Sequence, residues 1–62
     1  MTNKIAGLYK DSQGFFHQLF WTQKQWTVQI YNAEMRYCSY DRMSAEQAKH
    51  YILFLEKVEN IK

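Results

Sequence analysis

Residues 15–31 read FFHQLFWTQKQWTVQIY, a run in which aromatic and β-branched side chains predominate on both sides of Gln23 and Lys24. Such side chains are typical of strands, so the run predicts an antiparallel hairpin. A turn at Gln23 and Lys24, or a four-residue loop at residues 22–25, gives the same cross-strand pairs. These pairs share one face of the sheet: Trp21 with Trp26, Leu19 with Val28, and His17 with Ile30.

A further strand is predicted on each side of this hairpin. Residues 5–10 lead into it through a predicted turn at residues 11–14. Residues 35–40 follow it after a short connection at residues 32–34. Because side chains alternate between the two faces of a strand, the flanking strands extend the face that Trp26 occupies. The side chains that they and the hairpin add to this face are Ala6, Leu8, Phe15, Met35, Tyr37 and Ser39.

The C-terminal third has the pattern of a helix. Ser44 and Gln47 form a predicted capping box, in which the serine side chain accepts from the third helical amide and the glutamine side chain reaches back. We expect a helix from about residue 45 to about residue 59. The apolar residues that recur at helical spacing are Ala48, Ile52 and Leu55.

The chain is therefore predicted to be a single domain over residues 1–62, of the α+β class. Its antiparallel sheet, over about residues 5–40, has three to four strands in meander order and packs on one C-terminal helix. Whether the first predicted strand joins the sheet stays open. The helix covers the face that holds Trp26, which makes that face the predicted core.

The opposite face of the predicted sheet is aromatic and nearly uncharged, where an ordinary solvent-facing sheet would carry Lys, Glu and Thr. Its members are Ile5, Tyr9, Phe16, Gln18, Phe20, Thr27, Gln29, Tyr31, Arg36, Cys38 and Tyr40. Monomeric proteins rarely expose an apolar patch larger than a few hundred Å². We therefore predict a partner-binding face made of Tyr9, Phe16, Gln18, Phe20, Gln29, Tyr31, Arg36 and Tyr40.

Length and composition limit the ways in which this domain is stabilised. A chain of 62 residues buries a small core and is marginally stable without help. The single Cys38 excludes an internal disulfide, and His17 and His50 do not provide the spacing of a zinc site. We expect support from oligomerisation or from a larger partner. The unpaired cysteine and the lack of an N-terminal apolar run predict a cytoplasmic location without membrane attachment.

No catalytic site and no cofactor are predicted. His17 falls on the core face, where a histidine bonded to the backbone is expected, and His50 falls on the solvent side of the helix. No acid or nucleophile is expected beside either histidine. Cys38 is expected to be a small apolar contact on the outer side of the sheet rather than a reactive thiol. The protein is thus predicted to bind a partner and not to be an enzyme.

The predicted function is that of an adaptor or inhibitor, of the kind that phages and mobile elements encode, which docks on another protein through the aromatic face. Tyr and Phe give large contact areas, and interface centres are poor in charge. Self-association into a homodimer, with two such sheets face to face, is a compatible alternative. Leu53 and Phe54 lie off the predicted buried stripe. Phe54 is expected to pack on the sheet edge, and a second contact surface at both residues stays open.

A nucleic-acid-binding module is the alternative function. Aromatic side chains on a sheet stack unpaired bases, and Arg36 and Lys24 would contact the backbone. Between residues 12 and 33, however, Lys24 is the only charged residue. Phosphate contacts supply most non-specific affinity, so this scarcity of cations favours a protein partner. The polar residues in the same stretch are largely glutamines: Gln13, Gln18, Gln23, Gln25 and Gln29.

Three segments support that alternative through a resemblance. They are Trp26-x-Val28-x-Ile30, Arg36-Tyr37-x-x-Tyr40-Asp41 and Ser44-Ala45-Glu46-x-Ala48-x-x-Tyr51. Their order, three strands followed by a helix over about residues 15–55, resembles the plant AP2 domain and the arm-type DNA-binding domain of tyrosine integrases. The resemblance implies a sheet that enters the major groove of DNA. Those families carry a run of arginines on the first strands, where this sequence has Phe16, Gln18 and Phe20.

Overall fold

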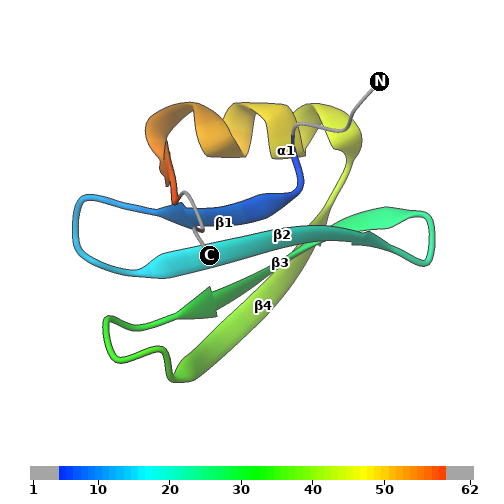
Figure 1. The fold of residues 1–62 in the computed structure, drawn as a ribbon. Coiled ribbons are helices and arrows are strands. Elements are labelled where there is room, and N and C mark those ends of the chain that lie inside the picture. The colour runs from blue at the N-terminus through cyan, green and yellow to red at the C-terminus, as the bar shows by residue number, and fades with distance from the viewer. Residues whose placement is uncertain (1–4, 59–62) are drawn as a thin grey trace.

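The computed structural model describes residues 5–58, in which five antiparallel strands form one sheet with a short helix on one face (Figure 1). The elements in chain order are β1 (Gly7–Lys10), β2 (Phe16–Thr22), β3 (Gln25–Tyr31), β4 (Tyr37–Met43), α1 (Ala45–Tyr51), the 3₁₀ turn η1 (Ile52–Phe54) and β5 (Glu56–Lys57). The strand order is β4-β3-β2-β1-β5, so four strands form a meander and β5 returns beside β1. The predicted α+β class is confirmed, and the first predicted strand belongs to the sheet.

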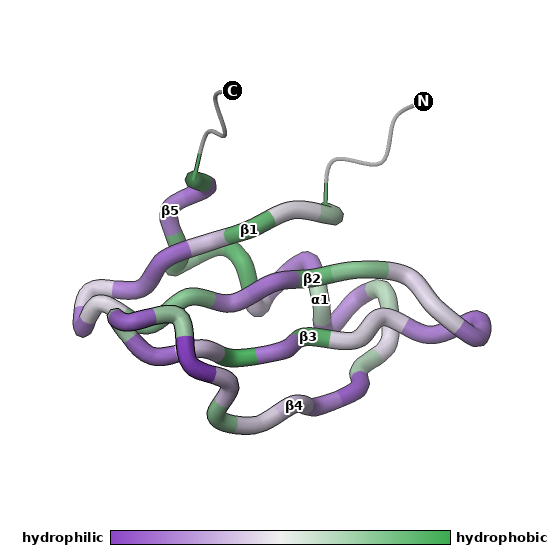
Figure 2. Tube along the Cα trace, turned by 60° about the horizontal axis from the view of Figure 1, so that its bottom comes forward, coloured by the Kyte–Doolittle hydropathy of each residue, from purple (hydrophilic) through white to green (hydrophobic). Residues whose placement is uncertain are grey.

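The central hairpin has the predicted register. Trp21 pairs with Trp26 across β2 and β3, and Leu19 pairs with Val28. Gln23 and Lys24 both have positive φ angles, of 52° and 64°. Positive φ at both central residues gives the turn a twist that matches the twist of the two flanking strands, which is why such turns dominate two-residue hairpins. Along β3, hydrophobic and hydrophilic residues alternate as expected for a strand with one face in the core (Figure 2).

The loop between β1 and β2 contains one residue more than predicted, and this reverses the faces of β1. Lys10 pairs with Phe16, so residues 11–15 form the loop. The amide of Asp11 donates to the carbonyl of Phe15, and the Asp11 carboxylate accepts from two loop amides. Tyr9 therefore lies opposite His17 in the core, at 3% exposure. The prediction that Tyr9 belongs to the partner-binding face is wrong, and Leu8, predicted for the core, lies on the other side.

Strand β4 begins and ends later than predicted. Residues 32–36 form a loop in which the Asn32 side chain accepts from two backbone amides and Met35 has a φ of 64°. A bulge between Ile30 and Tyr31 shifts the pairing, so that Tyr31 lies opposite Tyr37. Tyr37, predicted for the core, is 54% exposed and lies on the side away from the helix. The bulge adds one residue to β4 between Tyr37 and Ser39. It therefore moves Tyr37 to the face opposite the predicted one, while Ser39 and Tyr40 keep their predicted faces.

The helix begins as predicted but ends early. Ser44 Oγ accepts from the Gln47 amide at 3.2 Å, and Gln47 Oε1 accepts from the Ser44 amide at 3.0 Å, as the capping box requires. After α1 and η1, the backbone becomes extended at Leu55, and the Val58 amide donates to the Leu8 carbonyl beside β1. The expectation of a helix to about residue 59 is wrong, because Glu56 and Lys57 join the sheet as β5. Residue 59 itself lies outside the described residues.

The core lies between α1 and the sheet. Its buried apolar residues are Tyr9, Leu19, Trp26, Val28 and Ala48. Ala48 is the buried residue of α1, which contacts β3 and β4. Met43, directly before the helix cap, pairs with Trp26 and closes one end of the core. This packing fixes one face of the sheet against α1 and leaves the other face uncovered.

Candidate binding face

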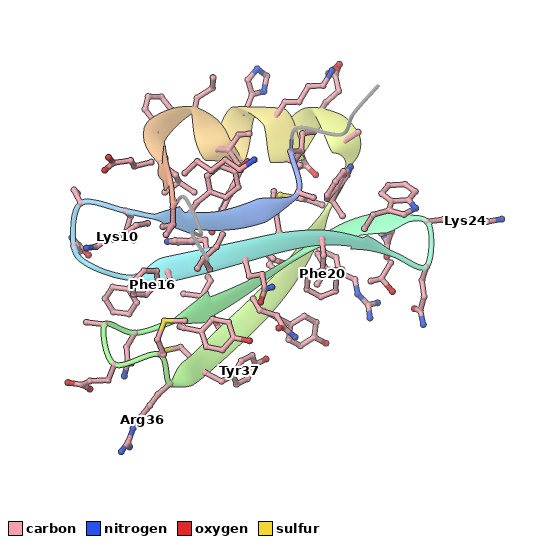
Figure 3. All side chains as sticks on the ribbon, viewed as in Figure 1. Lys10, Phe16, Phe20, Lys24, Arg36 and Tyr37 are labelled. Atoms are coloured by element: carbon pink, nitrogen blue, oxygen red, sulfur yellow. The ribbon has the colours of Figure 1, made fainter. Side chains whose placement is uncertain are left out.

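The uncovered side of the sheet, called the outer face from here on, carries mainly aromatic, amide and hydroxyl side chains (Figure 3). Strand pairing places on it Leu8, Lys10, Phe16, Gln18, Phe20, Thr22, Thr27, Gln29, Tyr31, Tyr37, Tyr40 and Arg42. Helix α1 lies on the opposite side, and no element of residues 5–58 covers the outer face (Figure 1). The face therefore has the aromatic character that the sequence predicted, with a partly different membership.

The structure brings together six of the eight side chains that the sequence predicted for the partner-binding face. These are Phe16, Gln18, Phe20, Gln29, Tyr31 and Tyr40. The two exceptions have different causes. Tyr9 is buried in the core because of the longer β1–β2 loop. Arg36 lies in the loop before β4 and its side chain points away from the sheet (Figure 3), so its predicted place on the face is also wrong.

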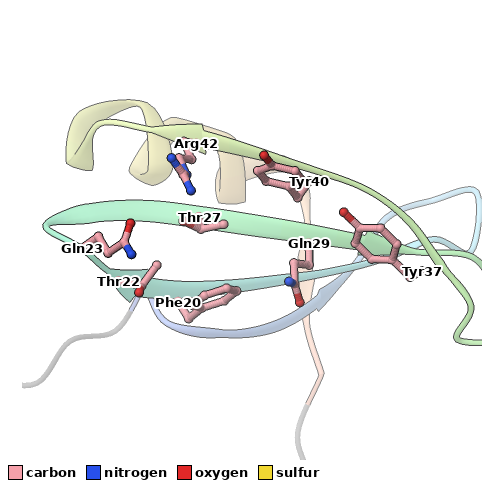
Figure 4. Close-up of a pocket in the computed structure, with 8 residues that line it drawn as sticks. All are labelled: Phe20, Thr22, Gln23, Thr27, Gln29, Tyr37, Tyr40 and Arg42. Atoms are coloured by element: carbon pink, nitrogen blue, oxygen red, sulfur yellow. The ribbon is translucent and has the colours of Figure 1, made fainter.

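A hollow of about 370 Å³ lies on the outer face over β2, β3 and β4 (Figure 4). Its lining residues are Phe20, Thr22, Gln23, Thr27, Gln29, Tyr37, Tyr40 and Arg42. The hollow exists because the short Thr27 sits on the central strand between two longer side chains, with Phe20 opposite it on β2 and Arg42 opposite it on β4. The floor is therefore a threonine and the walls are aromatic and basic.

Two polar groups in the hollow have a defined hydrogen-bonding state. The Tyr31 hydroxyl donates to Gln29 Oε1 at 2.9 Å, and the Gln29 NH₂ group has no hydrogen-bond partner among the described residues. Thr27 Oγ1 is buried and has no hydrogen-bond partner among the described residues. A buried hydroxyl without a partner is destabilising, so such groups in native structures require an explanation.

Arg42 supplies the positive charge of the hollow. Its guanidinium lies over the ring of Tyr40, 5.9 Å from the ring centre. No carboxylate of residues 5–58 forms an ion pair with it. The neighbouring Asp41 faces the helix side, opposite Val28, because adjacent residues of a strand point to opposite faces. The guanidinium is thus held on an aromatic surface without a neutralising partner.

The other basic side chains near the outer face are dispersed. Lys10 lies over the ring of Phe16, 5.7 Å from its centre, at the far side of the face from the hollow. Lys24 is at the tip of the β2–β3 hairpin and Arg36 is in the β3–β4 loop, and both point outward (Figure 3). The arrangement provides one cation inside a hollow rather than a continuous basic stripe.

A second polar cluster lies on the helix side of the sheet, around the buried His17. His17 Nε2 lies 2.9 Å from Asp11 Oδ2, and Nδ1 lies 2.6 Å from the Tyr51 hydroxyl. We expected a core histidine bonded to the backbone with no acid beside it. Both expectations are wrong, because the loop at residues 11–15 folds the Asp11 carboxylate back onto β2.

The pKa shifts in this cluster follow from these contacts. The hydrogen bond from His17 lowers the pKa of Asp11 most, and the backbone amides of Phe15 and Gln13 lower it further. Burial raises the pKa of Tyr51, and the negative charges of Asp11 and Asp41 add to the increase. The Tyr51 hydroxyl is protonated at neutral pH, and it donates to His17 Nδ1 when the proton of a neutral ring lies on Nε2. The cluster ties the β1–β2 loop, β2 and α1 together.

Metal ligands, the cysteine thiol and membrane spans are the remaining features of the described residues. No group of three His, Cys, Asp or Glu side chains within residues 5–58 is arranged to hold a metal ion. The Cys38 thiol is exposed and donates to the Arg36 carbonyl at 3.5 Å. No helix in this part of the chain is long and apolar enough to cross a membrane.

Leu53 and Phe54 lie on the 3₁₀ turn after α1 and are exposed. The expectation that Phe54 packs on the sheet edge is wrong, since it is 89% exposed. The turn presents both side chains outward because the chain there leaves the helix to reach β5. A second contact surface at these residues stays open.

Five residues that line the hollow are not among those predicted for the partner-binding face, and one sequence signal points to Arg42. The five are Thr22, Gln23, Thr27, Tyr37 and Arg42. Arg42 and Tyr37 take their places because β4 runs on to Met43 and starts after a loop that Asn32 closes. An apolar residue directly before the Ser44 cap indicates that the strand continues to that point. No sequence signal marks the unpartnered hydroxyl of Thr27.

Comparisons with protein-family models, with curated proteins and with solved structures find no match for this chain.

Proposed function

We propose that this protein is a small non-enzymatic binding protein, an adaptor or inhibitor, that docks on a partner protein through the outer face. The observation that carries the proposal is the exposure of large aromatic side chains on a face that no described element covers. Tyr37 and Tyr40 are both more than half exposed, and Phe20 lies between them and the hairpin tip. Aromatic side chains provide large contact areas at low entropy cost and are enriched at protein interfaces.

The size and polarity of the outer face support a protein partner. The molecule has principal extents of 29 × 24 × 21 Å. A rectangle with the two longer extents is roughly 700 Å² in area and sets the flat outline within which the outer face lies, comparable with the ~800 Å² that each partner contributes to a standard interface. Gln18 and Gln29 provide polarity without charge in its middle, as in interface centres, where charged residues are depleted. The exposed thiol of Cys38 fits a reducing, cytoplasmic setting.

Nucleic-acid binding is the second candidate function, and one observation favours it. Arg42 lies beside Tyr40 on the outer face, and an arginine next to exposed aromatic rings is a known platform for single-stranded bases. The weakness of this candidate is the dispersal of the remaining cations, Lys10, Lys24 and Arg36. Phosphate contacts provide most of the affinity for nucleic acid and need several cations along one path.

Site-specific photo-crosslinking in the source cell tests the proposal. A photoreactive phenylalanine replaces Tyr40 on the outer face in one variant and His50 on the exposed side of α1 in the control. We expect a discrete protein adduct from position 40 and none from position 50. The adduct partner, once purified, should bind the wild-type protein, and Phe20→Ala should weaken that binding by a factor of about thirty, as loss of an aromatic anchor does.

The other outcomes of this experiment decide against the proposal. Adducts with nucleic acid from position 40 favour the second candidate function. A dimer of the chain as the sole adduct assigns the outer face to self-association. Protein adducts from position 50 alone place the interface on the helix side.

A further inference from the structure

We propose that the hollow on the outer face binds a side-chain carboxylate, from an Asp or Glu of the partner protein. This inference rests on the proposed function, because it names the chemical group that the partner presents. It is carried by three features of the hollow that are independent of one another: an unpaired guanidinium, an amide NH₂ group without a partner among the described residues, and a buried hydroxyl without a partner.

The hydrogen-bond donors of the hollow come from two strands. Arg42 extends from β4 toward β3, and Gln29 stands on β3 at the other end of the hollow (Figure 4). The Tyr31 hydroxyl uses one lone pair of Gln29 Oε1, and the NH₂ group of Gln29 has no hydrogen-bond partner among the described residues. An arginine and an amide NH₂ both require acceptors, so these two groups favour a ligand that brings acceptors.

Thr27 provides the second reason to place a polar ligand here. It is 5% exposed, lies on the floor of the hollow, and its Oγ1 has no hydrogen-bond partner among residues 5–58. Its cross-strand neighbours are Phe20, which has no polar group, and Arg42, which has no acceptor. The Thr27 hydroxyl oxygen has almost no accessible surface, so it would donate to a ligand oxygen only after its side chain rotates toward the hollow.

The charge distribution selects an anion. Arg42 has no carboxylate partner among the described residues, and Asp41 points to the opposite side of the sheet. The aromatic rings of Phe20 and Tyr40 lower the local polarity around the guanidinium, which strengthens an ion pair formed there.

A carboxylate fits these groups better than a phosphodiester. The planar fork of an arginine pairs with both oxygens of a planar carboxylate. A nucleic-acid strand carries a phosphate at every nucleotide and needs several cations along its path, whereas Lys24 alone lines a neighbouring hollow together with Arg42. Lys10, Lys24 and Arg36 are each at a different edge of the molecule (Figure 3).

The test is a titration of the isotope-labelled full chain with two capped tripeptides, followed by NMR at a protein concentration below that at which sedimentation detects dimers. Acetyl-Gly-Glu-Gly-amide carries the carboxylate, and acetyl-Gly-Gln-Gly-amide is the uncharged match of the same shape. We expect saturable shifts at the amides of Thr27, Gln29 and Arg42 with the Glu peptide alone. The dissociation constant should be on the order of 10 mM, as fits one ion pair with a few hydrogen bonds.

Two arginine variants provide the matched control. Arg42→Gln should weaken binding of the Glu peptide by about tenfold or more, because a charged hydrogen bond is lost. Arg36→Gln removes the same charge outside the hollow and should leave the dissociation constant unchanged. Equal shifts with the two peptides, equal effects of the two variants, or no saturable shift at all would each overturn the inference.

Oligothymidylate serves as the third probe and separates the two anion chemistries. Binding at micromolar or lower concentration in physiological salt, lost in Arg42→Gln, would assign the hollow to a phosphate and overturn the carboxylate. The inference and the proposed function fail separately. If Tyr40 crosslinks to a protein and Phe20→Ala weakens the complex while the Glu peptide does not bind, the proposed function stands and the inference alone is wrong.

Discussion

The carboxylate of Asp11 accepts a hydrogen bond from Nε2 of the buried His17 at 2.9 Å. Because an ionised carboxylate is only an acceptor, this contact places a proton on Nε2. In the neutral ring, Nδ1 is then an acceptor, and the Tyr51 hydroxyl 2.6 Å away donates to it. A loop residue therefore sets the tautomer of a strand residue, and that tautomer sets the contact with the helix.

The variant Tyr51→Phe tests the helix end of this cluster. It keeps the ring, which meets His17 edge-on at a centroid distance of 5.5 Å, and removes the donor. A buried acceptor left without its partner costs ~1–3 kcal/mol, so we expect a loss of that size in the free energy of unfolding, measured by urea titration. Tyr37→Phe on the exposed outer face is the control and should change stability little.

The variant Asp11→Asn tests the loop end through pH. The pKa of Asp11 is lower in the folded chain than in the unfolded chain, where it is about 3.9. The contribution of Asp11 to the free energy of unfolding is therefore complete when the pH is above the pKa of the unfolded chain. It is lost as the pH falls through the lower pKa of the folded chain. We expect wild type to exceed Asp11→Asn in thermal midpoint at pH 6, and the difference to shrink steadily below pH ~4.

The control for the pH series is Glu34→Gln, which removes one carboxylate from the exposed β3–β4 loop. It should follow the wild-type curve closely. A difference between wild type and Asp11→Asn that stays constant from pH 6 to the acid limit would show that the loop carboxylate does not act through its charge.

The core register is tested by Trp26→Ala. Trp26 is buried, and its loss should cost ~3–5 kcal/mol. A chain of 62 residues has a total stability of only about 3–9 kcal/mol at the usual value per residue. We expect circular dichroism to show a largely unfolded variant. The ring of Trp21 meets that of Trp26 edge-on, with 5.5 Å between the ring centres, and Trp21 is exposed. Trp21→Ala removes this contact and should cost about 1 kcal/mol.

The central hairpin and the helix cap could be predicted from the sequence because both depend on short-range chemistry. The Gln23-Lys24 turn fixes the pairs on both sides of it, and the Ser44-Gln47 box fixes where α1 begins. Each signal lies within a few residues of the feature it controls. The central pairs and the first residue of the helix were therefore correct.

The outer strands could be located but not assigned to faces, because loop length controls which side each residue takes. One additional loop residue moved Tyr9 into the core, and one bulge moved Tyr37 out of it. The side chains of Asp11 and Asn32 close these loops with hydrogen bonds to amides two and four residues later. The sequence contains both residues, but their geometry appears only when the backbone is folded.

Self-association through the outer face is a further prediction. In the absence of its partner, the purified protein should form dimers at micromolar concentration, because Tyr37, Tyr40 and Phe20 leave an aromatic surface in water. Sedimentation over a concentration series measures this, and Tyr40→Glu should return the protein to a monomer. A wild-type monomer at high concentration would mean that the face is reserved for a different molecule.

The last prediction separates stability from binding at Thr27. In Thr27→Val a methyl group replaces the buried hydroxyl that has no partner among the described residues. Removing an unsatisfied polar group without changing the shape of the side chain should stabilise the fold by up to ~1 kcal/mol. In a domain this small, that gain in the free energy of unfolding raises the thermal midpoint by about 4–8 °C. Thr22→Val, at the rim of the same hollow, controls for the higher strand preference of valine.

The same Thr27→Val variant should bind the Glu peptide several-fold more weakly than wild type, since the ligand oxygen loses one donor. A residue that lowers stability in the free protein and raises affinity for a ligand is expected at binding sites, where local stability is exchanged for function. If Thr27→Val is instead less stable than wild type, the hydroxyl has a structural partner and the hollow has one donor fewer. If its affinity for the Glu peptide is unchanged, the carboxylate is held by Arg42 and Gln29 alone.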